Sequence, residues 1–155
     1  MEKEEIFYEL METLFETSRS ISTYESIPRK YGTKDELYMI EAHTLNLIGD
    51  KIKTNTTEIA EITHRTKSAV SQMMDKLIKK ELAFKYRNPD NYRELTIELT
   101  PKGQLVYEYH KKLDKEEFGN YLSDLENFTT EDFQKIITFL TLINGRTKST
   151  LHDKS

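Results

Sequence analysis

Two short amphipathic segments, separated by a turn of about three residues, restrict the fold of this chain more than any other feature. The first is expected to start with Asn55 and Glu58, to end near His64, and to carry Ile59, Ala60 and Ile62. Thr66 is expected to cap the second helix, whose inward face holds Val70, Met73, Met74, Leu77 and Ile78. Two helices joined so closely predict a helix-turn-helix.

The outward face of the second helix carries small polar and basic side chains. They are Lys67, Ser68, Ser71, Gln72 and Lys76, with Thr66 just before the first turn. In helix-turn-helix proteins a helix of this kind enters the major groove of DNA. Gln72 has the amide chemistry that pairs with adenine, whereas the lysines are expected to contact phosphates. The alternative for each residue is an ordinary solvated side chain.

A β-hairpin is predicted directly after this pair of helices. Residues 82–87 and 94–100 alternate with the period of strands. The loop between them, 88–93, is rich in turn formers and ends in Arg93. These features predict a wing, with Lys85 expected to contact phosphate.

The net charge of −4 argues weakly against a nucleic-acid partner, but the charge is unevenly distributed. Between His64 and Arg93, eight basic and three acidic residues give +5, so the remainder of the chain carries −9. Positive charge concentrated in one segment is the electrostatic footprint of phosphate binding.

The remaining sequence predicts helices on both sides of this region. An amphipathic helix is expected from about Glu4 to about Ser22, and a second is expected to be capped by Thr33 with Glu36 and to bury Leu37, Ile40, Thr44, Leu47 and Ile48. A long helix follows Pro101-Lys102-Gly103. The last helix is capped by Thr129 with Asp132, Phe128 packs on Phe133, and a frayed tail begins near Arg146. We expect one domain over 1–155.

Several classes of protein are excluded or disfavoured by what the sequence lacks. There are no cysteines, which removes disulfides, thiolate nucleophiles and cysteine-ligated zinc. The sequence has no Gly-rich phosphate loop, no nucleophile elbow and no His-Glu-x-x-His run, so an enzyme is not expected. It also has no apolar run of membrane length and no basic-then-apolar start, so no membrane association and a cytoplasmic location are expected.

From Thr57 to Gly103 the sequence resembles the MarR family of bacterial transcriptional regulators. The resemblance rests on the Glu-Ile-Ala helix, on Ser68-Ala69-Val70-Ser71-Gln72 leading to Asp75-Lys76-Leu77, on the Asn-Pro wing with Arg93, and on Leu99-Thr100-Pro101-Lys102-Gly103. It implies a mainly α fold with a small β-hairpin wing: a winged helix-turn-helix lobe, about 35–100, and dimerisation helices, about 4–30 and 102–148.

The resemblance implies a homodimeric repressor that binds palindromic double-stranded DNA and is modulated by a small ligand. The expected DNA-binding residues are Thr66, Lys67, Ser68, Ser71, Gln72, Lys76, Lys85, Arg87 and Arg93. The sequence departs from the family pattern twice. Asn91 stands where the family usually has Asp, and Glu81 stands where Gly is common, which indicates either a left-handed residue or a different helix exit.

Four residues occupy places resembling those that hold zinc in the zinc-responsive branch of the family: Glu25, His43, His110 and Asp114. We predict no metal and no cofactor, because histidines at similar places also occur in fatty-acid-synthesis repressors of the family and His43 is expected to be a partly buried, hydrogen-bonded residue. Two alternatives stay open. One is a zinc-responsive regulator of the same fold, and the other is a winged-helix module that binds protein instead of DNA.

Overall fold

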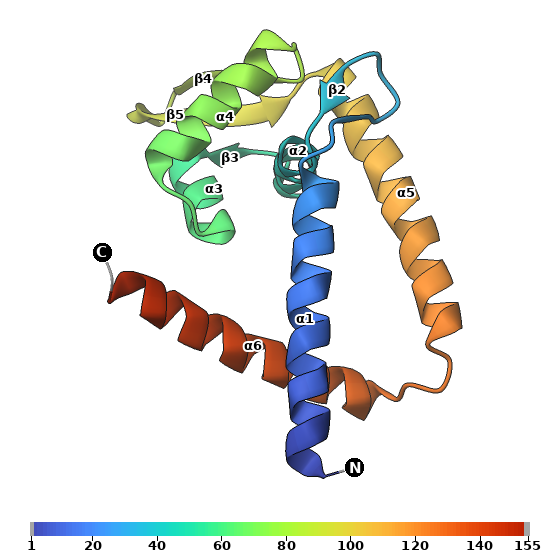
Figure 1. Cartoon of the computed structure of the whole chain (residues 1–155). Coiled ribbons are helices and arrows are strands. Elements are labelled where there is room, and N and C mark those ends of the chain that lie inside the picture. The colour runs from blue at the N-terminus through green and yellow to red at the C-terminus, as the bar shows by residue number, and fades with distance from the viewer. Residues whose placement is uncertain (1, 154–155) are drawn as a thin grey trace. The chain divides into compact units, whose positions relative to one another are not determined.

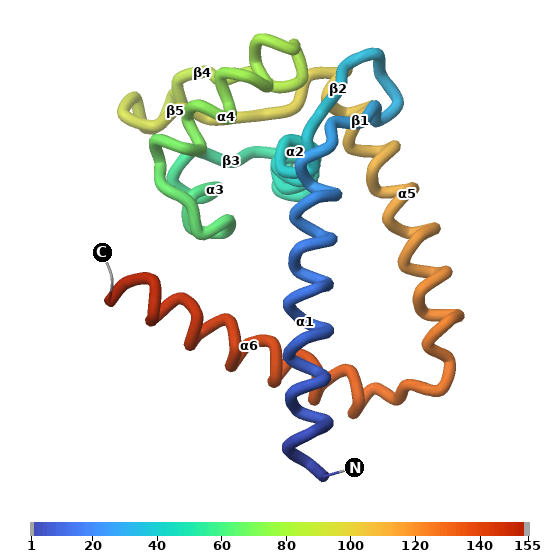
Figure 2. Tube along the Cα trace, viewed as in Figure 1, coloured from blue at the N-terminus to red at the C-terminus, as the bar shows by residue number. Residues whose placement is uncertain are grey.

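Helices form most of the computed structural model, which describes residues 2–153, and the short strands form two small sheets (Figures 1 and 2). In chain order the described elements are α1 Lys3–Glu25, β1 Arg29–Lys30, β2 Glu36–Leu37, α2 Met39–Lys51, β3 Thr54–Asn55, α3 Thr56–Thr63, α4 Lys67–Lys79, β4 Ala83–Asn88, β5 Asn91–Leu99, α5 Pro101–Asp124 and α6 Thr130–His152. The predicted mainly α fold with a small wing is confirmed.

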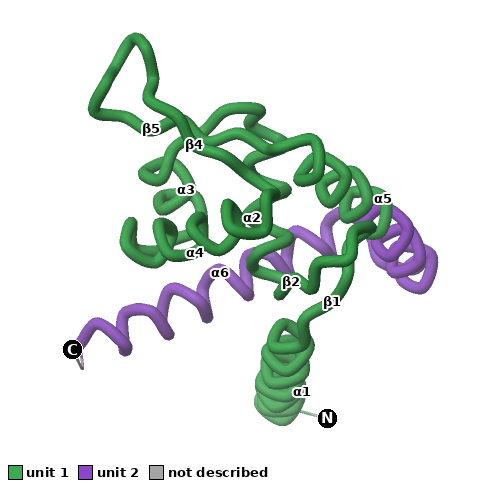
Figure 3. Tube along the Cα trace, turned by 90° about the horizontal axis from the view of Figure 1, so that it is seen from above, with its two compact units in different colours: residues 1–113 green, residues 114–155 purple. Residues whose placement is uncertain are grey.

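The chain divides into two compact units, Met1–Leu113 and Asp114–Ser155 (Figure 3). The predicted DNA-binding lobe, about 35–100, lies within the first unit. The boundary falls inside α5. The grouping of the whole chain as a single domain stays a prediction.

The start of α2 differs from the sequence prediction. The helix begins at Met39, not after Thr33, because Leu37 is fully buried in strand β2, which pairs with β1. The Thr33 hydroxyl instead donates to Asp35, and at the start of α2 the Tyr38 amide donates to the Glu41 carboxylate at 2.8 Å. The buried face of the helix shifts accordingly and consists of Glu41, Ala42, Thr44, Leu45 and Ile48.

The core of the first unit lies between α2, α3, α4 and the sheet. Figure 1 shows α3 and α4 beside β4 and β5. The fully buried side chains are Leu37, Leu45, Ile48, Ile59, Met74, Leu77, Leu82, Ile97 and Val106. Burying an aliphatic side chain contributes about 1.5–3 kcal/mol, so this cluster fixes the position of α4 on the lobe.

The wing, formed by β4 and β5, is a tighter hairpin than the predicted loop 88–93. Asn88 pairs with Asn91, so only Pro89 and Asp90 lie between the strands. Asn side chains close the turn, because Asn88 Oδ1 accepts from Asp90 N at 3.0 Å and Asn91 Oδ1 accepts from Arg93 N at 3.2 Å. A third strand, β3, pairs with β5 and was not predicted.

The last helix, α6, starts as predicted, whereas α5 starts at Pro101, three residues earlier than the prediction, which placed it after Gly103. Pro101 is the first residue of α5, where a missing backbone N–H costs nothing. Thr129 and Asp132 form the capping box of α6, and the Phe128 and Phe133 ring centroids lie 5.8 Å apart. The helix continues to His152, beyond Arg146, where fraying was expected. Among residues 2–153, no helix has the length and apolarity needed to cross a membrane.

Two lysines connect the C-terminal end of α4 to β2, α2 and α5. Lys80 Nζ lies 2.9 Å from the buried carboxylate of Glu41 and donates to the Glu36 carbonyl at 3.0 Å. Lys102 Nζ donates to the Lys80 carbonyl at 2.9 Å and pairs with Asp35 at 2.8 Å. The hydrogen bond from Lys102 holds the pKa of Asp35 below its ordinary value, against the opposing effect of burial.

We predict that Gly103→Ala destabilises the protein by about 2–3 kcal/mol, the upper part of the range for overpacking. A Cβ at this position would meet the Leu82 carbonyl oxygen at 1.8 Å, and that oxygen accepts the Thr100 amide. Gly119→Ala is the matched control, because no atom lies within 4 Å of its added Cβ, and helix propensity favours alanine there by up to about 1 kcal/mol. Denaturant unfolding measures both, and equal stability of the two variants would contradict the contact.

We predict that Lys102→Met lowers the unfolding free energy at pH 7 by about 1–2 kcal/mol. Because the folded pKa of Asp35 is depressed, its contribution is present above the unfolded value of about 3.9 and is lost as the pH falls through the folded value. The difference from wild type should therefore shrink below about pH 4. Lys135→Met, which removes the exposed Glu131 pair, is the control and should change stability little. A difference independent of pH would count against the Asp35 pair.

Candidate nucleic-acid interface

The helix-turn-helix is built from two capped helices and a left-handed turn. Asn55 Oδ1 accepts from Glu58 N at 2.8 Å at the start of α3, and Thr66 Oγ1 accepts from Ala69 N at 3.1 Å at the start of α4. His64, with φ of 54°, ends α3 in the left-handed conformation. Both predicted caps are confirmed, and the turn occupies three residues, 64–66.

Helix α4 separates an apolar face from a polar one. Val70, Met74 and Leu77 are buried, and Met73 and Ile78 are partly buried. The predicted outward residues are exposed along the opposite side, and these are Lys67, Ser68, Ser71, Gln72 and Lys76. The arrangement leaves amide, hydroxyl and ammonium groups available to a partner.

The wing presents three cations in different environments. Lys85, Arg87 and Arg93 are all exposed. Lys85 Nζ lies 3.5 Å from Asp75 of α4, and Arg87 Nη1 donates to the Tyr92 carbonyl at 2.7 Å. All nine predicted contact residues are therefore exposed, but their contacts with DNA stay a prediction.

The two departures from the family pattern have different outcomes in the structure. Glu81 adopts φ of 59°, so the first alternative, a left-handed residue, holds. The amide of Glu81 donates to the Ile78 carbonyl at 2.9 Å, and the amide of Leu82 donates to the Leu77 carbonyl at 3.0 Å. These two hydrogen bonds form the C-terminal cap that usually has glycine at the left-handed position. Asn91 accepts a hydrogen bond from the amide of Arg93, so it shapes the turn that presents this cation.

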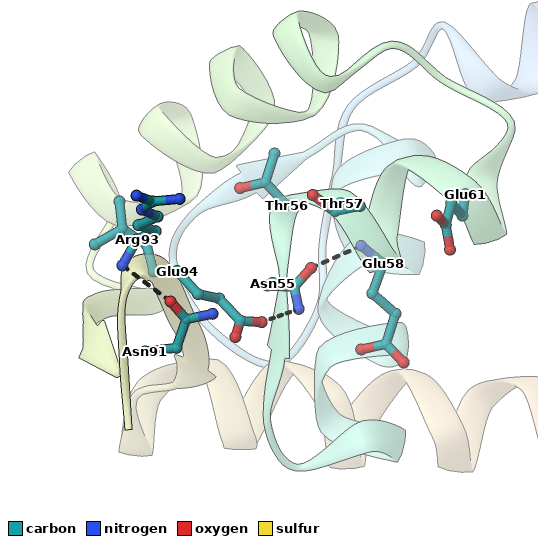
Figure 4. Close-up of a pocket in the computed structure, with 9 residues that line it drawn as sticks. Asn55, Thr56, Thr57, Glu58, Glu61, Asn91, Arg93 and Glu94 are labelled. Carbon is teal, nitrogen blue, oxygen red and sulfur yellow. Dashed lines mark hydrogen bonds between the residues drawn. The ribbon is translucent and has the colours of Figure 1, made fainter. Parts of the chain in front are cut away.

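An open cleft of about 550 Å³ lies between the start of α3 and strand β5 (Figure 4). It is lined by Asn55, Thr56, Thr57, Glu58, Glu61, Asn91, Arg93, Glu94 and Leu95. Hydrogen bonding from Thr54, followed by pairing with Lys51, lowers the pKa of Glu58. On the wing, the hydrogen bond from Tyr86 to Glu98 raises the pKa of the phenol.

Sequence reasoning missed the contact between Asn55 and Glu94, in which Asn55 Nδ2 donates to the carboxylate. The two residues are far apart in sequence, and Asn55 was interpreted only as a helix cap. The signal that could have found the contact is the unassigned N–H₂ group of a capping asparagine, which a serine or threonine cap lacks.

The histidines are placed differently from the prediction. His43 is exposed rather than partly buried, whereas His110 is 3% exposed. His110 Nδ1 lies 2.5 Å from Asn46 Nδ2. The rings of Tyr31 and His110 meet in a T-shaped arrangement, and the ring centroids of His43 and His110 lie 5.3 Å apart. His43 lies outside the buried face of α2, which consists of Glu41, Ala42, Thr44, Leu45 and Ile48.

The predicted zinc-like set is not gathered into a metal site. Glu25 ends α1, and Asp114 is the first residue of the second unit. Within residues 2–153, no group of three or more His, Asp or Glu side chains is close enough to hold a metal ion. The absence of a metal therefore stays a prediction.

Comparison with known proteins gives the same assignment as the sequence and the fold. The MarR family matches residues 37–95. The uncharacterized HTH-type transcriptional regulator YhjH of Bacillus subtilis is 32% identical over 66% of this chain and 59% of the relative, and HTH-type transcriptional regulator PchR of the same organism is 30% identical over 66% and 60%. The chain thus spans about 60% of the length of these curated relatives.

The fold also matches that of Lactococcus lactis ZitR, wild type in complex with DNA. The TM-score is 0.71 at 20% identity, over 90% of this chain and 97% of that one. The family match covers the helix-turn-helix and most of the wing, and the structural match covers most of the chain. Residues 37–95 of this chain, which hold the helix-turn-helix and most of the wing, are therefore similar to the MarR family.

Proposed function

We propose that this protein is a non-enzymatic, sequence-specific transcriptional regulator that binds double-stranded DNA. The observation that carries the proposal is the polar face of α4, capped at Thr66 and exposed beside a cationic wing. The relatives named as transcriptional regulators and the ZitR structure with DNA support it.

Each side chain is assigned a contact with DNA that suits its chemistry. Ser71 and Gln72, near the start of α4, face base edges in the major groove, and the glutamine amide favours adenine. Lys67, Lys76 and Lys85 contact phosphates and supply affinity that falls with salt. Arg93 enters the minor groove and responds to its width. The guanidinium of Arg87 already donates to the Tyr92 carbonyl, so its larger contribution is to the shape of the wing.

A homodimer is part of this proposal. Every side chain of α1 and α6 is at least partly exposed, including large apolar ones such as Phe7, Phe15 and Ile137. Apolar stripes of this size need a cover, and a second copy of the chain supplies an identical one. Two copies present two recognition helices, which suits a palindromic operator.

We further propose repression, with relief or modulation by a small ligand, in a cytoplasmic protein. The family resemblance supports these points. Zinc is the weaker alternative, because no group of three or more potential metal ligands is found among residues 2–153. A winged-helix module that binds only protein is the other alternative, and the salt dependence of DNA binding separates it from the main proposal.

To test DNA binding, duplexes are selected from a random pool with the purified protein and titrated at several salt concentrations. We expect dissociation constants that rise steeply with salt, because lysines release counterions from phosphates. Arg93→Ala and Gln72→Ala should each weaken binding by about 1–3 kcal/mol, with Gln72→Ala also relaxing the base choice.

Lys135→Ala in α6 is the control and should bind as the wild type does. Its lysine pairs with Glu131 and lies outside the proposed interface. Selection of no duplex at low salt, or a salt slope near zero, would overturn the proposed function in favour of the protein-binding alternative.

To test the dimer, sedimentation velocity compares wild type with Ile137→Glu, whose side chain is 63% exposed in α6. A charge placed in an apolar dimer interface should shift the assembly toward monomer by at least about tenfold in the dissociation constant. Gln134→Glu, on an exposed polar position of the same helix, should leave the dimer intact. A monomeric wild type would contradict the proposed assembly.

A further inference from the structure

Asn55 lies where three elements meet. Its backbone pairs with Thr96 of β5, and its side-chain oxygen caps α3 through Glu58 N at 2.8 Å. The other half of the same amide, Nδ2, donates to the carboxylate of Glu94 on β5, as Figure 4 shows. One side chain thus joins the first helix of the helix-turn-helix to the base of the wing.

Glu94 extends this connection toward the tip of the wing. Its second oxygen lies 3.5 Å from Nδ2 of Asn88, the residue that begins the turn. The carboxylate is partly buried and directly follows Arg93 in the chain. The hydrogen bonds therefore run from α3 through Asn55 and Glu94 to both strands of the wing.

We propose that Asn55 and Glu94 are positioning residues that hold the wing at a fixed place relative to the helix-turn-helix. This inference rests on the proposed function. The hydrogen bond between Asn55 and Glu94 fixes the position of Arg93 relative to α4. It thereby determines which site in the minor groove Arg93 reaches when α4 contacts a given set of bases in the major groove. A wing held in advance also avoids the ordering cost that a mobile wing would incur on binding.

The negative charge of Glu94 favours a role in positioning the wing over direct contact with DNA. A negative charge beside Arg93 opposes phosphate, so Glu94 weakens direct electrostatic attraction to DNA. The hydrogen bonds that Glu94 accepts from Asn55 and Asn88 explain why a carboxylate lies at the cleft. Asn55 suits the other end because an amide accepts and donates at once, whereas an aspartate would cap α3 equally well but could not donate.

The test exchanges the hydrogen-bond donor and acceptor between positions 55 and 94. Asn55→Asp keeps the cap, loses the N–H donor and places two carboxylates face to face. The double variant Asn55→Asp/Glu94→Gln restores a donor–acceptor pair with the roles reversed, and its net charge equals that of wild type. We expect Asn55→Asp to weaken binding to a selected duplex by about tenfold and the double variant to recover to within about threefold of wild type.

A second readout reports position directly. Arg93→Ala is measured in the wild-type and Asn55→Asp backgrounds, with thermal unfolding followed in parallel. If the wing is released, Arg93 is no longer held in place, so its removal should cost at least about threefold less in the Asn55→Asp background. Amide hydrogen exchange over 88–93 should also be faster in Asn55→Asp and return to the wild-type rate in the double variant.

The outcomes separate this inference from the proposed function. If wild type selects no duplex, the proposed function fails and this inference fails with it. If wild type binds but the double variant recovers nothing, or Arg93→Ala costs the same in both backgrounds, only the positioning by Asn55 and Glu94 is overturned.

Discussion

The geometry of the helix-turn-helix lobe depends on the interactions of the buried carboxylate of Glu41. It is 3% exposed, accepts the Tyr38 amide at 2.8 Å, and pairs with Lys80 at 2.9 Å. A charge removed from water is tolerated only with such partners, and removing one leaves a costly unpaired group. Because Lys80 follows the last residue of α4 and Glu41 lies in the first turn of α2, the pair fixes one end of α4 against α2. Lys102 continues the connection to the start of α5.

Local signals in the sequence were sufficient to predict the caps of α3, α4 and α6 and the two faces of α4. Asn55, Thr66 and Thr129 cap helices where expected, because a side-chain oxygen and an amide three residues on are adjacent in any helix start. The same capping pattern at Thr33 was misleading. Leu37 was the deciding residue there, since its burial in the β1–β2 pair outweighed a weak local preference.

Contacts between distant segments explain what the sequence could not predict about the candidate site. The exposed face of α4 follows from helical periodicity alone, so Lys67, Ser71 and Gln72 were found. The bond between Asn55 and Glu94 depends on the pairing of β3 with β5, a two-residue strand that has no alternating pattern of its own. The exposure of His43 likewise depends on tertiary packing, which determines that Glu41, Ala42 and Leu45 form part of the buried face of α2.

The helices α1 and α6, which have no buried residues, have a consequence for how the proposed regulator responds to its own abundance. If two copies must associate before their apolar stripes are covered, the amount of binding-competent protein at low abundance grows with the square of the monomer concentration. Occupancy of an operator would then rise more steeply than the level of the protein itself. The surface that one chain leaves uncovered thereby gives a gene under its control a sharper threshold than a monomeric binder could provide.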